Sequence, residues 1–357
     1  MSGSETNQDS ENASRLVLRT YRATDHDYVL HVFYSAAFGL VPEGIKRKLM
    51  SPVFWTIWLT SCYCLVTVVP AVISGAHWPR WILWLMRIAL VLGWILAAFV
   101  VLFIFTDRWE VVGHIEEAQQ NDLSDPEVYY LNWVKKEVIV DDSPPVKPSS
   151  SSNKKRVTFD KSAKPATEMV RTLRPAKEQT LSHFWVLAMD NVPIGMVGLA
   201  NYRERVYDNR ISIPSLWDAL RETVSRWIPW LSSSIVADRV VVDEDDVQDD
   251  KRVFAEPHAP KSATLQRLAV KPDYQGCGLS TLLINNVMLW AHKQGLESIY
   301  ATTNEMQQSA QTILHTRHGF QKIKKTRKGW LGQYEIVWKC TVDQWMKDHE
   351  DLAKQLL

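Results

Sequence analysis

The fold of this chain is decided by one stretch, Leu268-Ala269-Val270-Lys271-Pro272-Asp273-Tyr274-Gln275-Gly276-Cys277-Gly278-Leu279-Ser280. A strand predicted over residues 264–270 ends in it, and a glycine-bearing loop leads directly into a helix predicted over residues 279–294. Consecutive backbone N–H groups in such a loop can face one anion, and the helix N-terminus adds positive potential. The stretch therefore predicts a phosphate-binding loop, and a tight turn that binds nothing is the alternative.

The C-terminal third around this stretch alternates between apolar strands and amphipathic helices. Further strands are predicted over residues 298–303, 319–324 and 334–340, and a second helix is predicted over residues 306–317. Such alternation implies a mixed sheet with helices packed against it. We therefore expect an α/β (α+β) fold with a mixed central sheet flanked by helices.

The loop resembles the pyrophosphate loop, Q/R-x-x-G-x-G/A, of the GNAT superfamily of acetyl-CoA-dependent N-acetyltransferases. Ser280 stands where the family has its final Gly or Ala, and the resemblance covers about residues 264–340, with a weaker echo over residues 184–201. The chain is most similar to the camello-like, or N-acetyltransferase-8-like, branch, which places an apolar hairpin between the first two helices. The segments that resemble this branch are Phe184-Trp185-Val186, Gly195-Met196-Val197-Gly198 and Gly319-Phe320-Gln321-Lys322.

This resemblance implies a GNAT-type fold and the transfer of acetyl from acetyl-CoA to a primary amine, with no metal. Backbone groups of Leu268 and Val270 would pair with the pantetheine arm of the donor, and Asn304 would steady it. The pyrophosphate would be held by the backbone amides of Gln275, Gly276, Cys277, Gly278, Leu279 and Ser280.

The departing thiolate of the donor needs a proton. In the family, a tyrosine four residues before the Gly-Phe pair donates it, and this chain has His315 at that position. A protonated imidazole can serve as this acid, and an exposed helix histidine without a catalytic role is the alternative. Glu256 and His258 are candidates for the general base, with a loop pair that takes no part in catalysis as the alternative.

Two apolar stretches form an inserted helical hairpin over residues 51–106. Residues 53–74 contain no charged residue, and residues 81–105 contain only Arg87. A bilayer takes about 20 apolar residues to cross, which each stretch supplies, and tryptophans lie near their ends. We therefore expect a transmembrane helical hairpin, and two buried core helices are the alternative.

The link between the two stretches is so short that both flanks of the hairpin must lie on the same side of the membrane. Lys46, Arg47 and Lys48 precede the hairpin and Arg108 follows it, so the positive-inside rule puts these flanks in the cytosol. We expect an integral membrane protein of the endoplasmic reticulum whose catalytic domain faces the cytosol.

The rest of the chain divides into catalytic segments and insertions. An apolar stripe predicts an amphipathic helix over residues 212–231. Its charges, Asp218 and Glu222 against Arg221 and Arg226, balance, so we expect it to cover the sheet, and a position on the bilayer is the alternative. In chain order we expect a disordered N-terminus (1–14), the first strand and helix of the catalytic domain (15–50), the hairpin (51–106), a helix of the catalytic domain (107–140), a disordered insertion (141–180), a β-hairpin (181–202), a second insertion with the amphipathic helix (203–262), the acetyl-CoA-binding core (263–341) and a C-terminal helical tail (342–357).

The first insertion contains a short motif, Lys154-Lys155-Arg156-Val157-Thr158-Phe159-Asp160. Its Val157 and Phe159 can point the same way when an extended peptide is added to a sheet edge. The motif resembles the docking peptide that protein phosphatase type 1 binds, through Arg156, Val157 and Phe159, and a phosphate on Thr158 would block it. A solvated linker is the alternative.

Composition excludes other functions. The formal net charge of +1 gives no field that attracts nucleic acid, so we expect no such partner. The four cysteines, Cys62, Cys64, Cys277 and Cys340, include no CxxC pair, so we expect neither a zinc site nor a disulfide framework. The polar N-terminus lacks the apolar segment of a cleavable signal peptide.

These observations lead to one expected function and two alternatives. We expect a membrane-anchored N-acetyltransferase that acts on a small molecule, such as an amino acid or a cysteine conjugate. A protein lysine N-acetyltransferase would use the same chemistry on another acceptor. A non-catalytic, membrane-tethered scaffold with the same fold is the third hypothesis.

The topology gives a test in cells. We predict that an N-glycosylation site engineered into residues 149–152 stays unmodified, because that insertion faces the cytosol when both flanks of the hairpin do. The measurement is the mobility of the protein before and after glycosidase treatment. Robust glycan addition at this site would put the catalytic domain in the lumen.

Overall fold

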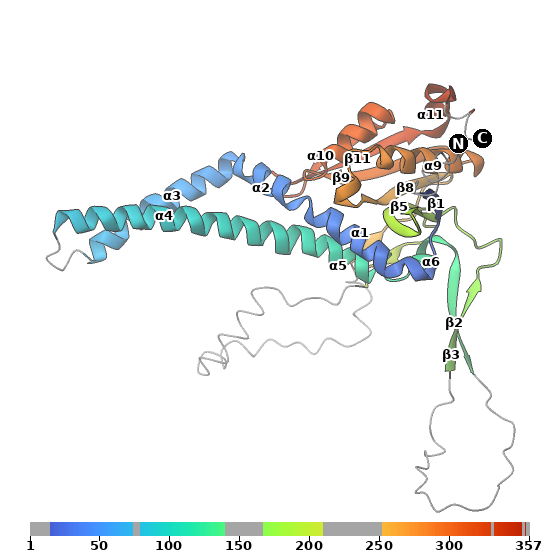
Figure 1. Cartoon of the computed structure of the whole chain (residues 1–357), viewed down its shortest axis with the longest axis horizontal. Helices are drawn as coiled ribbons and strands as arrows, with labels where there is room; N and C mark the ends of the chain where they lie inside the picture. The colour runs from blue at the N-terminus through green and yellow to red at the C-terminus, as the bar shows by residue number, and fades with distance from the viewer. Residues whose placement is uncertain are drawn as a thin grey trace, which may run out of the picture.

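The computed structural model describes residues 15–73, 79–139, 167–209, 252–329, 332–351 and 354. It consists of an α+β domain from which a pair of long helices projects (Figure 1). The predicted N-terminal segment 1–14, the docking motif at 154–160 and the amphipathic segment at 212–231 lie outside the described residues and stay predictions.

A seven-stranded mixed sheet, in the order β1-β4-β5-β8-β9-β11-β10, organises the domain, as the alternation of strands and helices predicts. Every neighbouring pair is antiparallel except β8 and β9, which are parallel. The strands are β1 Leu16–Thr20, β4 His183–Met189, β5 Val192–Ala200, β8 Ser262–Val270, β9 Ser298–Asn304, β10 Gln321–Arg327 and β11 Tyr334–Thr341.

The parallel pair separates along its length. Strand β8 pairs with β9 only through Ser262–Leu265 against Ser298–Ala301. Beyond that point β8 continues beside β5, and β9 continues beside β11 up to Asn304. The sheet is therefore open between the carboxyl halves of its two central strands.

Helices cover both faces of the sheet. On one face, α9 (Leu279–Lys293) and α11 (Val342–Asp348) pack through residues such as Leu283, Met288 and Trp345. On the other, α1 (His26–Phe38), which follows a short 3-10 turn at Ala23–Asp25, packs with α5 (Gly113–Gln120) and α6 (Pro126–Tyr130). Strands β4 and β5 are buried on both faces, which explains their nearly continuous apolar sequences.

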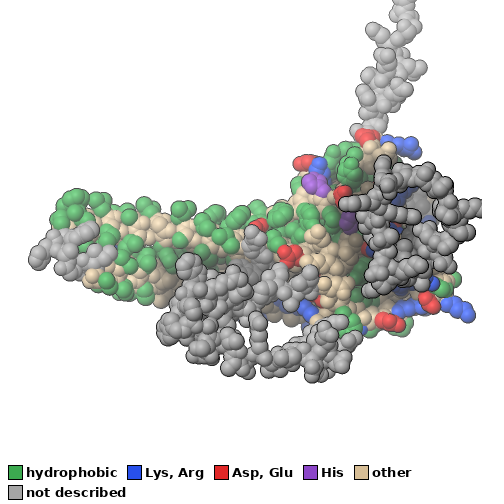
Figure 2. Space-filling view, turned by 90° about the horizontal axis from the view of Figure 1, so that it is seen from below, with side chains coloured by type: hydrophobic (Ala, Val, Ile, Leu, Met, Phe, Trp, Pro, Cys, Tyr) green, Lys and Arg blue, Asp and Glu red, His purple; other side chains and the backbone are tan. Residues whose placement is uncertain are grey.

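The inserted hairpin leaves the domain as two long helices whose apolar side chains face outward (Figure 2). Among the described residues, at most 6% of the apolar segment of either helix is buried, so neither helix lies in the core. Trp94 donates through Nε1 to the Trp58 carbonyl at 3.4 Å across the pair. The segments in order are α2 Val41–Leu49, α3 Pro52–Ile73, α4 Arg80–Phe105, a π-helical segment Thr106–Val112 and α5 Gly113–Gln120.

The structure corrects two predictions about the middle of the chain. The helix expected over residues 107–140 ends early, because α6 (Pro126–Tyr130) is followed by strand β2 (Trp133–Ile139). The insertion expected to be disordered over residues 141–180 contains strand β3 (Thr167–Leu173), which pairs with β2 antiparallel along its whole length. The helix first ends at Gln120, and the short α6 ends at Tyr130. The chain then turns into β2 at Asn132, whose φ is 61°, and β2 is rich in residues that favour strands.

Ion pairs attach this two-stranded arm to the domain. The Lys135 ammonium lies 2.6 Å from a carboxylate oxygen of Asp125, and the Arg171 guanidinium pairs with both Asp125 and Glu127. The ends of the second insertion also pair with each other, as β6 (Val206–Tyr207) and β7 (Val253–Ala255).

A buried ion pair joins β8 to the segment after α5. Arg267 donates from Nε and Nη2 to the carboxylate of Asp122, at 2.8 Å and 2.7 Å, and Asp122 is fully buried. Tyr130 donates its hydroxyl proton to the same carboxylate. Burial alone lowers the pKa of Arg267, but the carboxylate of Asp122 more than offsets this and holds it above its usual value.

We predict that Asp122→Ala lowers the free energy of unfolding by about 3–5 kcal/mol, because it leaves the buried Arg267 without its counter-ion. The measurement is urea unfolding of the purified full chain in detergent. The matched control is Glu297→Ala, which breaks an exposed ion pair with Lys261 and should leave the midpoint unchanged. Equal midpoints for the two variants would show that the buried pair does not stabilise the domain.

Candidate functional site

The predicted phosphate loop lies at the carboxyl end of β8. A 3-10 turn at Pro272–Tyr274 leads into it, and Gly278, at the N-cap of α9, ends it. Gly276 and Gly278 have φ angles of 82° and 78°, a backbone conformation that residues other than glycine rarely adopt. Apart from the glycine itself and its two chain neighbours, no atom of the described residues lies within 4 Å of a Cβ built on either glycine, so the outer side of the loop is open.

These torsions bring the six loop residues to the N-terminus of a 15-residue helix, where amide groups and the helix dipole favour an anion. Gln275 closes the loop by donating from Nε2 to the Val270 carbonyl at 2.9 Å. Cys277 is exposed within the loop, whereas Leu279 and Ser280 are half-buried at the first turn of the helix. The loop and its helix can therefore hold a phosphate group.

The strand before the loop offers a free edge. A bulge in β8 sets Met196 opposite Ala269 and Gly198 opposite Gln266, and Arg267 at the bulge has a φ of 52°. Since β9 no longer pairs with this half of β8, its backbone groups on that side can bond an extended ligand. Leu268 lies on this half, whereas the Val270 carbonyl is already bonded to Gln275.

Asn304 lies at the end of β9, across the opening from β8. Its Oδ1 accepts a hydrogen bond from the backbone amide of Met306 at 3.1 Å. The backbone amide of Asn304 donates to Oε1 of Gln307 at 3.2 Å. The side chain therefore caps the turn that leads into α10 (Gln308–Thr312).

His315 lies on the π-helical segment Ile313–Arg317, which follows α10. The residue is exposed, its Nδ1 lies 3.2 Å from the Phe320 carbonyl, and its ring centroid lies 6.1 Å from that of Trp338. In the neutral ring this bond keeps the proton on Nδ1, so Nε2 can donate a proton only when the ring is an imidazolium.

The two candidates for the general base lie elsewhere. Glu256 is exposed and pairs with Arg205 at 3.2 Å. His258 accepts a bond from the Tyr202 amide at Nδ1, and its Nε2 lies 2.7 Å from the hydroxyl of Thr264. Burial lowers the pKa of His258. Both precede the amino end of β8, so the structure does not bring them to the loop at its carboxyl end.

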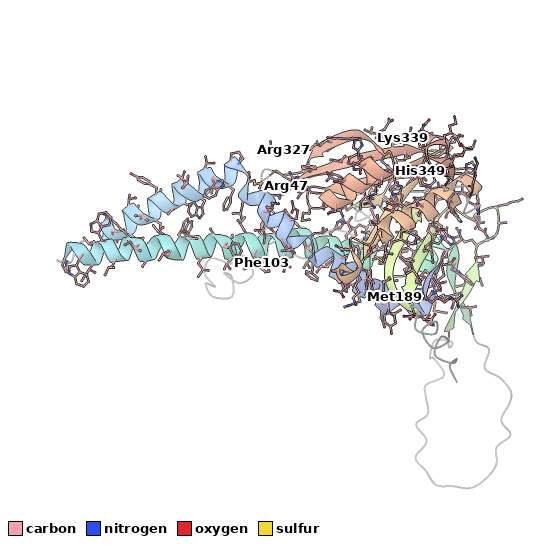
Figure 3. The ribbon with its side chains drawn as sticks, turned by 45° about the horizontal axis from the view of Figure 1, so that its top comes forward. Arg47, Phe103, Met189, Arg327, Lys339 and His349 are labelled. Carbon is pink, nitrogen blue, oxygen red and sulfur yellow. The ribbon has the colours of Figure 1, made fainter. Side chains whose placement is uncertain are left out.

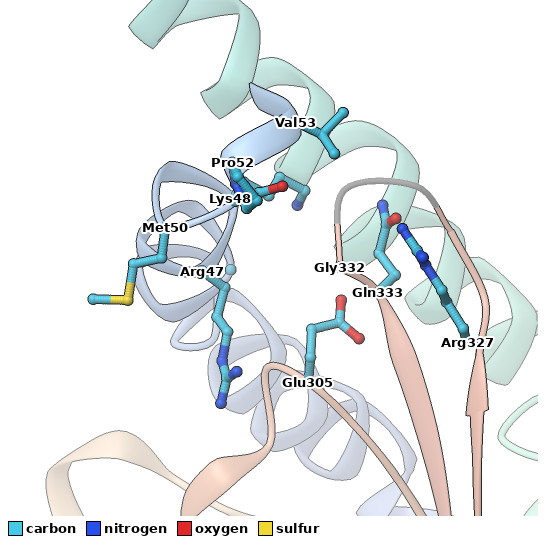
Figure 4. Close-up of a pocket in the computed structure, with 11 residues that line it drawn as sticks. Arg47, Lys48, Met50, Pro52, Val53, Glu305, Arg327, Gly332 and Gln333 are labelled. Carbon is cyan, nitrogen blue, oxygen red and sulfur yellow. The ribbon is translucent and has the colours of Figure 1, made fainter. Parts of the chain in front are cut away.

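A cavity of about 280 Å³ lies at the carboxyl end of β9, where the hairpin meets the domain (Figure 4). Two of its lining residues, Arg47 and Arg327, are labelled in Figure 3. The cavity contains Glu305, which follows Asn304 directly and which no sequence motif marks. The only signal was an acidic residue next to the end of a predicted strand. Its other lining residues include Arg47, Lys48, Met50, Arg327 and Gln333.

Glu305 is 7% exposed, and one of its carboxylate oxygens accepts a hydrogen bond from the Tyr334 amide at 3.1 Å. Burial raises the pKa of this carboxyl above its ordinary value. Among the residues that the structure describes, no cluster of three or more His, Cys, Asp or Glu side chains is arranged to hold a metal ion.

Comparisons with known proteins identify the domain. Residues 236–322 match the family model of the acetyltransferase (GNAT) domain. No curated protein matches the chain significantly. This match, which covers less than half of the chain, indicates a GNAT-type acetyltransferase domain and thus an acyltransferase, and acetyl-CoA is the acyl donor of GNAT enzymes.

Solved structures show similarity at low identity. A GNAT-family acetyltransferase from Staphylococcus aureus Mu50 is 10% identical, with 92% of this chain and 99% of that chain covered and a TM-score of 0.37. The ribosomal-protein-S18-alanine N-acetyltransferase from Escherichia coli is 14% identical over 47% and 74%, with a TM-score of 0.26. A Salmonella typhimurium protein solved with acetyl-CoA is 15% identical, with 46% of this chain and 66% of that chain covered and a TM-score of 0.26.

We predict that Gly278→Val weakens acetyl-CoA binding at least about tenfold, or roughly 1.4 kcal/mol. Valine disfavours the φ of 78° at this position, and its side chain would extend from the open side of the loop. The measurement is calorimetric titration of the full chain with acetyl-CoA.

The control for this variant is Gly295→Val, which has the same strain, at a φ of 70°, beyond the opposite end of α9. It should lower stability while acetyl-CoA affinity stays unchanged. A folded Gly278→Val variant with wild-type affinity would exclude the loop as the pyrophosphate site.

Proposed function

We propose that the protein transfers acetyl from acetyl-CoA to the primary amine of a small molecule while the α3–α4 hairpin anchors it in a membrane. The observation that carries the proposal is the glycine loop at the N-terminus of α9, next to the opening between β8 and β9. The loop supplies the anion site, and the opening supplies a free strand edge for the pantetheine arm.

Donor binding follows from this geometry. Amides from Gln275 to Ser280 hold the pyrophosphate, and backbone groups of β8 around Leu268 pair with the pantetheine arm. Asn304 borders the other side of the opening. The cap that it forms keeps the end of β9 in place, so it steadies the donor through the backbone.

The reaction needs a neutral amine and a protonated leaving group. A free alkyl amine has a pKa near 10, so it must lose a proton before its nitrogen attacks the thioester carbonyl. As the C–S bond breaks, the CoA thiolate takes a proton, and His315 as an imidazolium supplies it. The bond from His315 to the Phe320 carbonyl orients the ring for this role.

The membrane part of the proposal rests on the exposed apolar surface of the hairpin. Large side chains such as Trp84, Leu92 and Phe103 are exposed along α4, and an apolar surface of this extent is unstable in water. The resemblance to the camello-like branch supports the inserted hairpin. The basic residues that flank it support a catalytic domain on the cytosolic face, which we place at the endoplasmic reticulum. The dock for protein phosphatase type 1 stays a prediction from the sequence.

The test of the function is acetyl-CoA turnover by the full chain in detergent against amino acids, cysteine conjugates and lysine peptides. We expect release of CoA with one of the small amines. Turnover with peptides alone would indicate a protein lysine acetyltransferase. Acetyl-CoA binding without any turnover would indicate a non-catalytic scaffold.

We predict that His315→Phe lowers turnover about 10²-fold or more, because no proton donor then reaches the thiolate. Acetyl-CoA affinity should change little, and His315→Tyr should retain activity, since a phenol can donate the same proton. The measurement is kcat beside the dissociation constant of acetyl-CoA. Full activity of the Phe variant would remove His315 from the mechanism.

A further inference from the structure

We propose that the cavity at the foot of the hairpin is the amine-acceptor site and that Glu305 is the base that takes the proton of the amine. The inference rests on the proposed function, and it also specifies the acceptor as a primary amine with an anionic group close by. Neither the family match nor the sequence motifs assign a role to this cavity.

The position of the cavity follows from the sheet. Strands β8 and β9 are parallel, so their carboxyl ends lie at the same end of the sheet. The donor loop follows the end of β8, and Glu305 follows the end of β9. A donor held by the loop and an amine held at Glu305 therefore meet across the opening between the two strands.

Glu305 has the properties that a base needs here. It is almost fully buried, and the hydrogen bond from the Tyr334 amide fixes its carboxylate. Figure 4 shows the carboxylate between the helix that carries Arg47 and the turn that carries Gln333. The raised pKa of this carboxyl is closer to neutral pH than that of an exposed glutamate, so its carboxylate is the stronger base.

The other charges of the cavity decide the kind of amine. Lys48 is 3% exposed, bonds the Thr106 hydroxyl at 2.9 Å and forms an ion pair with Glu110. Arg47 and Arg327 line the same cavity from α2 and β10. A simple alkylammonium at Glu305 would also lie near the guanidinium of Arg47. An amine with a neighbouring phosphate or carboxylate places its ammonium at Glu305 and its anion at Arg47.

The location also indicates how an acceptor arrives. Pro52 and Val53, the first residues of α3, line the cavity together with the exposed Met50. Trp55, one turn further on, donates from Nε1 to the Leu49 carbonyl at 2.7 Å. The mouth thus lies where the apolar hairpin begins, so the amine can come from a lipid headgroup or from solution.

The transfer is balanced. Glu305 takes a proton from the ammonium, and the nitrogen lone pair then forms a C–N bond with the carbonyl carbon of the thioester. The C–S bond breaks, and the CoA thiolate takes its proton from the His315 imidazolium. The nitrogen releases its second proton to water as it becomes an amide. The products are the acetamide, CoA and, once Glu305 and His315 return to their starting states, one proton, and no oxidant or metal takes part.

The first experiment compares Glu305→Gln with Glu297→Gln in the full chain in detergent. Glu297 is exposed at the opposite end of β9, so its variant controls for the loss of one carboxylate. We expect Glu305→Gln to lower turnover about 10²-fold or more and to leave acetyl-CoA affinity within about twofold. Wild-type turnover in a folded Glu305→Gln variant would overturn the proposal. Equal loss of donor binding would also do so, because the role would then be structural.

The pH profile separates a base from a structural residue. Glu305 acts when deprotonated, so wild-type turnover should rise with pH through its raised pKa, and Glu305→Gln should remove that rise. The charged and titratable groups around Glu305 are Arg47, Lys48, Glu110, Lys325, Arg327 and Tyr334. An unchanged rise in Glu305→Gln would assign it to one of these groups or to the amine and would overturn the proposal.

The acceptor class is tested with matched pairs. The probes are O-phosphoethanolamine against ethanolamine, and an S-alkylcysteine against the corresponding S-alkylcysteamine, with vesicles of phosphatidylethanolamine as the lipid arm. We expect turnover only where an anion accompanies the amine. Arg47→Gln should raise the KM of that acceptor about tenfold. Turnover of the vesicles alone would identify a lipid source, and turnover of the soluble probes a soluble one.

Two outcomes would overturn the acceptor assignment. One is equal turnover of both members of each pair, which would show that Arg47 recognises no anion. The other is the absence of turnover for every probe in a wild-type protein that binds acetyl-CoA. Failure of acetyl-CoA binding itself would instead overturn the proposed function, so the two failures can be told apart.

Discussion

The buried ion pair between Arg267 and Asp122 is the interaction on which the rest of the domain depends. Arg267 lies at the bulge of β8 with a φ of 52°, which few residues adopt without support. The bidentate contact with Asp122, together with the Tyr130 hydroxyl on the same carboxylate, supplies that support. The bulge occupies the half of β8 that leaves β9, so the same interaction stabilises the opening between the strands.

Features of this structure that arise from local sequence patterns could be predicted, whereas contacts between distant residues could not. The glycine loop and the last four strands were predictable because their signals are local: a periodicity, a turn and a helix start within residues 264–340. The hairpin was predictable from length and charge alone. Arg267 and Asp122 were not, because 145 residues separate them and only the fold brings them together.

The same distinction explains the errors. Strand β2 follows directly after helix α6, and its partner strand β3 lies beyond a long insertion, so no local pattern distinguishes β2 from a continued helix. Glu305 is a single acidic residue after a strand, and it lies in a cavity lined by α2 and by Arg327, Gly332 and Gln333, which are distant in the sequence. His258 shows the reverse case, since a histidine near the core became a structural partner of Tyr202 and Thr264.

The uninterrupted course of the second hairpin helix has a mechanical consequence. From Arg80 through the π-helical segment to Gln120 the chain forms one rod, roughly 60 Å long at 1.5 Å per residue. The rod carries Thr106 and Glu110, which hold Lys48, and it ends beside Asp122. In the membrane-anchored arrangement that we propose, the tilt of this rod is coupled to the geometry of the catalytic domain. The hydrophobic thickness of the bilayer would then act on the enzyme as a thermodynamic variable, as an effector concentration does.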